Sequence, residues 1–259
     1  MNNTEKIKTT IFCKRLFTGE KVIDEAIVIV ENGIIISIQN DIPEGSEIVN
    51  LQGWNLAAGF LDIQVNGGEK YYFSQSPTEE ALQDICDSSL LYGTAYTLPC
   101  LISSSPENIL KAIEAVKAFM QKHNNGLLGM HLEGPFINPE KRGAHVKKLV
   151  RKPSDKELEE IIRYGKDVIK VMTIAPECFS DEQLEMLMDS GIVLSAGHTD
   201  ISYEKAQYYF SKGISLVTHL YNAMNQMLHR APGLVGAVFD NDNVYAPIIL
   251  DGAHCDYAA

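Results

Sequence analysis

The sequence predicts an α/β barrel of the TIM type that is missing its last unit, together with a small β part at the amino end. From about residue 56 onward, short apolar runs rich in β-branched residues alternate with segments that begin at helix-capping residues, which is typical of βα units around a parallel sheet. A length of 259 residues suits one barrel of this kind. The apolar runs begin at about residues 58, 95, 128, 168, 192, 214 and 246. A closed barrel has eight strands, so we expect an incomplete barrel.

The amino-terminal residues follow a different pattern. Apolar runs at residues 8–13, 25–30 and 34–38 predict short strands with no helix between them. The last two runs are joined through Asn32 and Gly33, and Asn-Gly is a strong hairpin signal. We therefore expect two parts, a small β-sandwich part at residues 1–55 and the barrel at residues 56–259.

The helices of the barrel are predicted from their caps. Ser76-Pro77-Thr78-Glu79 reads as a capping box with proline at the first helical position, and serines precede the other helical segments in a similar way. A last strand is expected at residues 246–252, after a loop through Pro232 and Gly233. The expected helices cover about residues 76–93, 105–123, 154–165, 180–190 and 202–212.

Composition excludes several classes of partner. The net charge is 22 − 34 = −12 with no long basic block, which argues against binding to nucleic acid or to an anionic membrane. The five cysteines are scattered singly, as in proteins of a reducing compartment. No apolar leader opens the sequence, and no run approaches the length of a membrane span. We therefore expect a cytoplasmic chain that acts on a small molecule.

Three metal-capable residues lie at the carboxyl ends of predicted strands. Glu133 ends the run GMHLE, His198 follows the run IVLSAG, and His219 ends the run ISLVTH. Taken singly, each has a purely structural explanation, as a core histidine with hydrogen-bond partners or a carboxylate that caps a loop. If the strands are neighbours in one parallel sheet, their ends converge. Together the residues then predict a site for a divalent cation with one carboxylate and two imidazoles.

Six segments in order along the chain resemble the N-acetylglucosamine-6-phosphate deacetylases of the amidohydrolase superfamily. The resemblance implies a TIM barrel with a small β-sandwich built from both chain ends, a homodimer, and removal of acetate from a phosphorylated amino sugar in amino-sugar catabolism. The segments are FLDIQVNG at 60–67, HLEGPF at 131–136, GAH at 143–145, GHT at 197–199, THLYNAM at 218–224 and DGAH at 251–254.

The resemblance also assigns residues. It makes Glu133, His198 and His219 the ligands of one divalent metal, with zinc as the first choice and iron, cobalt or manganese as alternatives. It makes His145 the group that stabilises the oxyanion. Without the resemblance, His145 reads as an exposed loop residue, Arg230 as a surface cation and His254 as a capped strand end. The resemblance implies that five residues contact the substrate, with the arginine reaching the phosphate across the dimer interface: Ala144, Asn222, Ala223, Arg230 and His254.

The sequence departs from the superfamily pattern in two ways. Many amidohydrolases have His-x-His after the first barrel strand, where this chain has Gln64 and Asn66, and amides are poorer zinc ligands than imidazoles. We therefore expect one metal ion, with Gln64 near it and His131 behind the ligands. The family's catalytic aspartate lies at the end of the eighth strand. Because the sequence stops before that position, we expect the 259-residue chain to be poorly active alone.

Two other functions remain open from the sequence. A related amidohydrolase could use the same metal site on another N-acyl sugar or on a cyclic amide. Alternatively, the chain could bind a sugar phosphate without catalysis.

Overall fold

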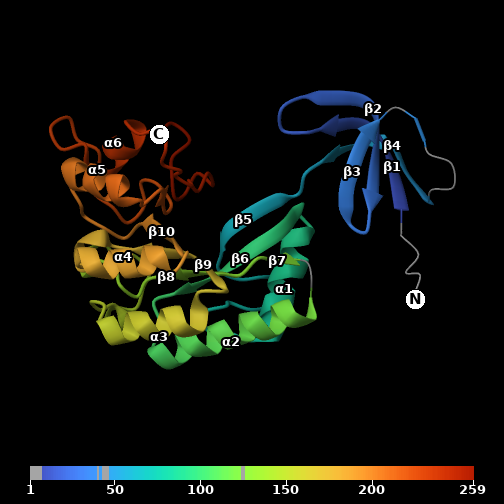
Figure 1. Ribbon diagram of the computed structural model, residues 1–259. Helices are drawn as coiled ribbons and strands as arrows, with labels where there is room; N and C mark the ends of the chain where they lie inside the picture. Colours follow the sequence, from blue (N-terminus) through green and yellow to red (C-terminus); the bar gives the residue numbers. More distant parts are fainter. Residues whose placement is uncertain (1–7, 40, 43–46, 124–125) are drawn as a thin grey trace. The chain divides into compact units, whose positions relative to one another are not determined.

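The computed structural model describes residues 8–39, 41–42, 47–123 and 126–259 (Figure 1). The chain divides into two compact units, one up to Gly59 and one from Phe60 onward. No helix in the described ranges is long and apolar enough to cross a membrane. All five cysteines are free.

The first unit contains one four-stranded sheet in the order β3-β2-β1-β4. Strands β1 to β3 confirm the three predicted strands, whereas β4 was not predicted, because polar residues and a glycine interrupt its apolar pattern. Asn32 and Gly33 have φ angles of 52° and 81° and form the expected tight turn between β2 and β3. The described residues form a single sheet here, so the sandwich stays a prediction. The strands are β1 (Lys8–Phe17), β2 (Val22–Glu31), β3 (Ile34–Gln39) and β4 (Glu47–Ala57).

The second unit is built on a parallel sheet in the order β11-β10-β9-β8-β6-β5, with β7 paired to β6. Except for β7, neighbours in the sheet are also neighbours along the chain, as in a barrel. In the described part of the chain, β5 and β11 form the two edges of the sheet. The strands are β5 (Phe60–Val65), β6 (Thr94–Ile102), β7 (Gly126–Leu127), β8 (Met130–Glu133), β9 (Ile169–Ile174), β10 (Val193–Ala196) and β11 (Leu216–Val217).

Helices alternate with these strands as predicted. Ser105, Ser154 and Ser180 cap α2, α3 and α4, each accepting a hydrogen bond from a backbone N–H of the first turn. The cap predicted at Ser76 was wrong: Thr78 has an extended backbone and its hydroxyl accepts from Ala81 N–H, so α1 begins later. The helices are α1 (Glu79–Leu90), α2 (Pro106–Lys122), α3 (Asp155–Gly165), α4 (Asp181–Asp189), α5 (Tyr203–Lys212) and α6 (Gly233–Phe239), with short 3₁₀ turns at Pro139–Lys141, Lys147–Leu149 and Pro176–Cys178.

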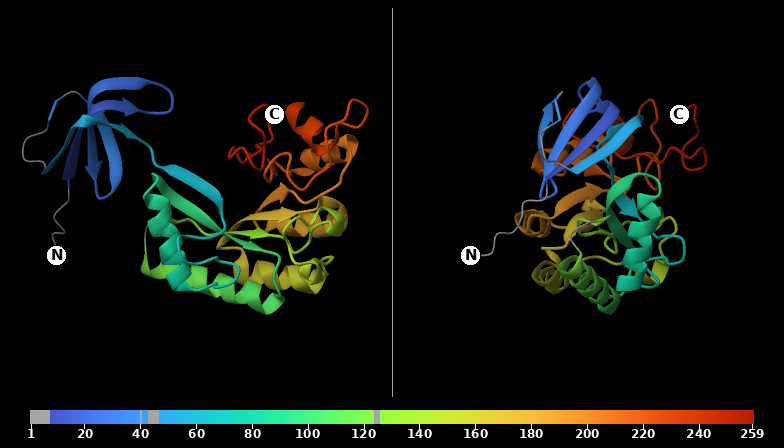
Figure 2. Two further views of the ribbon diagram at one scale, coloured as in Figure 1. Left: turned by 180° about the vertical axis from the view of Figure 1, so that it is seen from behind. Right: turned by 90° about the vertical axis from the view of Figure 1, so that its right-hand side faces the viewer.

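The helices α1 to α4 pack side by side in chain order along the sheet (Figure 2). Their apolar faces and the sheet share one core, in which Leu101, Leu132 and Met172 are fully buried. This burial fixes the strands relative to one another, and therefore fixes the positions at which their carboxyl ends emerge.

Two predictions for the carboxyl-terminal part were wrong. Residues 246–252 do not form a regular strand. Among the residues that the structure describes, the chain follows β11 here in only two places. Tyr245 forms an isolated bridge with Leu216, and Leu220 N–H donates to Pro247 O at 2.8 Å. Pro247 has no N–H to continue a ladder, and β11 offers only two residues to pair with. The loop predicted at Pro232 and Gly233 instead opens α6, whose small apolar residues are buried.

Candidate active site

The three predicted metal ligands meet at the carboxyl edge of the sheet. Glu133 is the last residue of β8, while His198 and His219 each lie two residues beyond the end of β10 and β11. Both histidines have left-handed backbone conformations, with φ angles of 49° and 32°. Such conformations are strained for residues other than glycine and are concentrated at functional sites. Here they turn both rings toward Glu133.

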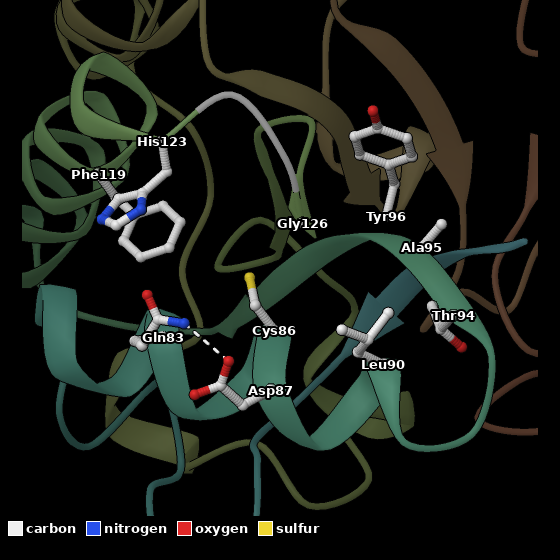
Figure 3. Close-up of a pocket in the computed structure, with 10 residues that line it drawn as sticks. All are labelled: Gln83, Cys86, Asp87, Leu90, Thr94, Ala95, Tyr96, Phe119, His123 and Gly126. Atoms are coloured by element: carbon white, nitrogen blue, oxygen red, sulfur yellow. Dashed lines mark hydrogen bonds between the residues drawn. The ribbon is translucent and has the colours of Figure 1, made fainter. Parts of the chain in front are cut away.

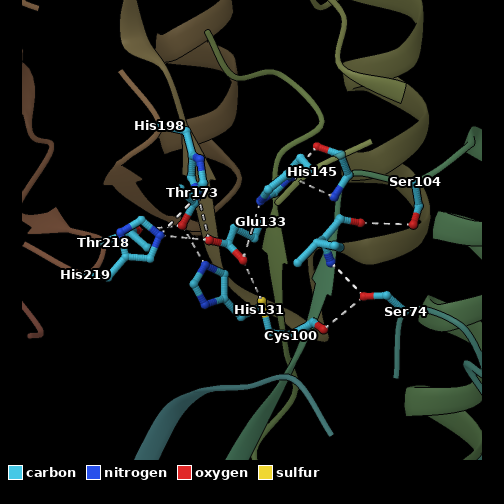
Figure 4. A network of polar contacts seen from close by, with 12 residues as sticks. Ser74, Cys100, Ser104, His131, Glu133, His145, Thr173, His198, Thr218 and His219 are labelled. Atoms are coloured by element: carbon cyan, nitrogen blue, oxygen red, sulfur yellow. Dashed lines mark hydrogen bonds and ion pairs between the residues drawn. The ribbon is translucent and has the colours of Figure 1, made fainter. Parts of the chain in front are cut away.

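The three side chains converge on one point (Figure 4). Glu133 Oε1 lies 3.0 Å from His198 Nε2 and 3.2 Å from His219 Nε2, and the two ring nitrogens are 3.1 Å apart. All three residues are buried. Their ligand atoms lie within 4.8 Å of one another, which makes them a group that could hold a metal ion.

The hydrogen bonds of the rings support a cation between these atoms. His198 Nδ1 lies 2.9 Å from the carbonyl oxygen of Lys141 and must donate to it, so in the neutral ring Nε2 carries a lone pair. That lone pair faces the Glu133 carboxylate and the second ring nitrogen. Within the described ranges, buried His219 Nδ1 has no hydrogen-bond partner. Electron-pair donors crowded together in this way fit a divalent cation, which satisfies them all at once.

Glu133 is held in its ionised form. Burial alone would raise the pKa of Glu133, but contacts with His145, His198 and His219 outweigh it and hold the pKa well below its usual value. The second carboxylate oxygen, Oε2, lies 3.3 Å from the thiol of Cys100, which donates to it. Burial first, and then the nearby Glu133 charge, raise the pKa of Cys100 well above its usual value, so the thiol keeps its proton.

His145 lies beside the three ligands. Its ring centre is 4.4 Å from that of His198, and its Nε2 is 3.9 Å from Glu133 Oε2. The other ring nitrogen, Nδ1, contacts both the backbone N–H and the hydroxyl of Ser103 at the end of β6. The sequence alone suggested an exposed loop residue, but His145 is buried.

These groups open into a pocket of about 290 Å³. Of the residues that the sequence predicts for the site, the pocket brings together the three predicted metal ligands with Gln64, Ala144, His145, Asn222, Ala223 and His254. Gly143 of the GAH segment also lines the pocket, as do four residues that the sequence did not assign: Asn66, Tyr72, Ile102 and Ile249. Asn66 could have been found, because it shares the face of Gln64 two residues earlier. The other three carry no chemical signal in the sequence.

Two of the assigned residues lie outside the pocket. Arg230 is exposed and does not line it. His131 is buried, and both of its ring nitrogens have protein partners, the carbonyl oxygen of Ile63 at 2.9 Å and the hydroxyl of Thr173 at 2.7 Å. His131 therefore ties β8 to β5 and β9 and has no nitrogen free for a metal.

Hydrogen bonds to the Asp251 carboxylate hold the His254 ring in place. Asp251 Oδ2 lies 2.7 Å from His254 Nδ1, and Asp251 Oδ1 accepts from the backbone N–H groups of Ala253 and His254. These hydrogen bonds lower the pKa of Asp251. The turn of the chain thus presents the His254 ring at the rim of the pocket.

A second pocket, of about 340 Å³, lies between α1, α2 and β6 (Figure 3). Its polar groups are largely engaged with one another: Gln83 donates to Asp87 at 2.8 Å, and the His123 ring stacks on Phe119. The pocket at Glu133 is therefore the better candidate for chemistry.

Comparisons with known proteins agree with this geometry. The chain is 36% identical over 245 residues to an N-acetylglucosamine-6-phosphate deacetylase of Haemophilus influenzae, covering 93% of this chain and 64% of the relative. It is 33% identical over 244 residues to an N-acetylgalactosamine-6-phosphate deacetylase of Shewanella, covering 93% of this chain and 62% of the relative. The chain thus spans less than two thirds of the length of these two relatives.

The crystal structure of N-acetylglucosamine-6-phosphate deacetylase from Pasteurella multocida superimposes with a TM-score of 0.92 at 33% identity, over 97% of this chain and 66% of that one. The second unit therefore has the TIM-like fold of these enzymes, with a curled parallel sheet. The model of the amidohydrolase family matches residues 55–254. The resemblance seen in the sequence is confirmed, and this chain belongs to the amidohydrolase family.

Proposed function

We propose that this chain carries the active site of a metal-dependent deacetylase. The reaction is hydrolysis of the acetamide of N-acetylglucosamine 6-phosphate to glucosamine 6-phosphate and acetate, in cytoplasmic amino-sugar catabolism. The observation that carries the proposal is the convergence of Glu133, His198 and His219 at the carboxyl edge of an amidohydrolase sheet. Both curated relatives described above are named for deacetylation of an amino-sugar phosphate.

Glu133, His198 and His219 would hold one divalent metal ion. Zinc is the first choice, because two imidazoles and one carboxylate are a common catalytic zinc set, and iron, cobalt or manganese are alternatives. A metal bound there would lower the pKa of a water molecule and polarise the acetamide carbonyl. The amides of Gln64 and Asn66 line the same pocket and are weak ligands, which supports a single-metal site.

The remaining pocket residues would bind and orient the sugar. His145 would donate a hydrogen bond to the oxygen that becomes negative in the transition state. Ala144, Asn222, Ala223 and His254 line the pocket and would contact the sugar phosphate. Exposed Arg230 would serve the partner subunit of a homodimer, since it does not reach the pocket of its own chain.

The decisive test measures acetate release by the zinc-loaded 259-residue chain, with binding of the same sugars measured by calorimetry. N-acetylglucosamine 6-phosphate should bind at least about tenfold more tightly than N-acetylglucosamine, because the proposed contacts include the phosphate. Acetate should form only from a phosphorylated sugar and only with metal present. Equal binding of the unphosphorylated sugar, or acetate release that persists without metal, would contradict the proposal.

A second substrate is favoured by the Shewanella relative, which is named for the galactosamine epimer. The same assay with N-acetylgalactosamine 6-phosphate ranks the two sugars by their kcat/KM values. This chain alone is expected to release acetate slowly, so the assay is repeated with the segment that carries the family's catalytic aspartate supplied. A chain that binds either sugar phosphate but releases no acetate even then would support the non-catalytic alternative. A chain that turns over only cyclic amides would support a different amidohydrolase.

A further inference from the structure

Ser103 is the only partner that the described residues give to the Nδ1 atom of His145. The Ser103 hydroxyl lies 2.7 Å from this nitrogen and the Ser103 backbone nitrogen 3.3 Å from it. Both residues are 3% exposed, so water does not compete for these contacts. The two residues come from different loops, one following β6 and one following β8.

The backbone contact fixes which nitrogen carries the proton. A backbone N–H can only donate, so Nδ1 must accept and carries a lone pair. In a neutral ring the proton then lies on Nε2, the nitrogen on the side of Glu133. Nε2 lies 3.9 Å from Glu133 Oε2, so its N–H is directed to the same part of the pocket as the carboxylate.

We propose that Ser103 is a positioning residue that holds the His145 ring as the Nε2–H tautomer and directs this N–H into the pocket. The hydroxyl is the stronger of the two contacts, since it is shorter and lies within the ordinary range for a strong hydrogen bond. The consequence for catalysis rests on the proposed function, in which His145 donates to the developing oxyanion. The effect on the ring itself does not depend on that function.

Two features hold Ser103 in place. The preceding residue, Ile102, donates its N–H to the Ser74 hydroxyl at 2.9 Å, which fixes the end of β6. Gly134 leaves the space that the Ser103 hydroxyl fills: a Cβ atom at Gly134 would lie 2.5 Å from Ser103 Oγ, and its φ of 77° also favours glycine. The serine side chain is therefore confined between Gly134 and His145.

The test reads the ring nitrogens directly by long-range ¹H–¹⁵N NMR on histidine-labelled protein, both metal-free and zinc-loaded. The signals of His145 are assigned by their loss in His145→Gln. In the wild-type chain, Nδ1 should appear unprotonated and hydrogen-bonded, with Nε2 protonated. In Ser103→Ala the Nδ1 signal should move toward that of a nitrogen without a hydrogen bond, whereas Ser103→Thr should keep the wild-type position because it retains the hydroxyl.

Ser104→Ala is the matched control. It removes the same atom one residue later, where the hydroxyl donates to the carbonyl oxygen of Ile102 at 2.9 Å instead of contacting His145. This variant should leave the His145 signals unchanged. A protonated Nδ1 in the wild-type chain, or a Nδ1 signal that does not move in Ser103→Ala, would overturn the inference.

Kinetics separate this inference from the proposed function. If His145 assists deacetylation, Ser103→Ala should lower kcat about 2- to 10-fold with little change in KM, the range expected for one neutral hydrogen bond, and Ser103→Thr should restore it. An NMR shift in a chain that hydrolyses no acetamide, even with the segment that carries the family's catalytic aspartate supplied, would refute the proposed function and leave the role of Ser103 intact. If Ser103→Ala instead raised KM and left kcat unchanged, Ser103 would not assist the deacetylation step through His145.

Discussion

His131 and His198 are both buried at the same sheet, but their ring nitrogens are used differently. Both nitrogens of His131 have protein partners, Ile63 and Thr173. In His198 one nitrogen donates to the Lys141 carbonyl, while the other faces the Glu133 carboxylate and a second imidazole. Burial and proximity to a carboxylate are therefore insufficient signs of a metal ligand. The informative feature is a ring with one nitrogen fixed by the protein and the other converging with further donors.

His131 is the first member of a chain of hydrogen bonds that continues through the hydroxyls of Thr173, Thr218 and Ser195. Burial lowers the pKa of His131, and the neutral ring, which donates through Nδ1, accepts from Thr173 through Nε2. Thr173 is then free to accept from Thr218, and Thr218 from Ser195, each at 2.6 Å. This chain of hydrogen bonds joins β8, β9 and β10 with the segment after β11, beneath the proposed metal ligands. The polar side-chain atoms of His131, Thr173 and Thr218 thus all have partners within the protein.

The largest effect is expected from a ligand substitution. Glu133→Gln replaces a carboxylate by an amide, a poor zinc ligand, and should weaken zinc binding by more than about 100-fold. Zinc content after dialysis against a competing chelator measures this, and circular dichroism checks that the variant folds. A Glu133→Gln chain that keeps one zinc ion with unchanged affinity would show that the metal, if bound, lies elsewhere.

Metal removal should have the next largest effect. Because the crowded acceptors are stabilised by a cation, zinc at about 100 times its Kd should raise the free energy of unfolding by about 2.7 kcal/mol, if the unfolded chain does not bind it. Thermal unfolding with zinc and with a chelator measures the difference. The same difference in Glu133→Gln would mean that zinc stabilises the chain through other residues.

His131→Leu should lower the free energy of unfolding and leave zinc binding unchanged. It leaves the Ile63 carbonyl and the Thr173 hydroxyl without their partner, which should lower the free energy of unfolding by about 2 kcal/mol. His123→Leu, at an exposed ring that stacks on Phe119, is the control and should change stability by less than about 0.5 kcal/mol. Loss of zinc from a folded His131→Leu chain would erase the distinction between the two histidines.

The smallest effect is expected at Cys100. Removal of its hydrogen bond to Glu133 Oε2 in Cys100→Ala should weaken zinc binding about tenfold, since partners of metal ligands typically contribute about 10- to 100-fold. Cys100→Ser should retain most of the affinity because it keeps a donor. Cys178→Ala, at a cysteine outside the pocket, should have no effect. Equal affinities in Cys100→Ala and Cys100→Ser would show that the thiol does not orient Glu133.

Periodic elements and strand ends could be predicted from this sequence. Apolar runs that end at or near Glu133, His198 and His219 predicted that these three side chains meet, because parallel strands bring their carboxyl ends to one edge, and the structure does bring them together. The irregular parts could not be predicted in the same way. Residues 246–252 look like a strand until Pro247 and the short β11 are considered. The helix α6 is a short apolar segment that contains two glycines and has no side-chain cap at its start.

The pocket walls were harder to predict than the ligands. Tyr72, Ile102 and Ile249 read as ordinary apolar or aromatic residues, and only the folded chain brings them to one cavity. Ser103 was missed for a related reason, since its role depends on a loop that places His145 against it from 42 positions further along the chain. That the barrel lacks its last unit stays a prediction.

X-ray absorption of the zinc-loaded chain tests the central claim most directly. The account predicts one zinc ion per chain, bound only by nitrogen and oxygen at about 2.0–2.2 Å, with the signature of two imidazoles. Cys100 is the competing ligand to exclude, because its sulfur lies 3.3 Å from Glu133 Oε2. If it bound the zinc ion, a zinc–sulfur distance of about 2.3 Å would be seen. A zinc–sulfur distance, or a site without two imidazoles, would contradict the assignment of Glu133, His198 and His219 as the metal ligands.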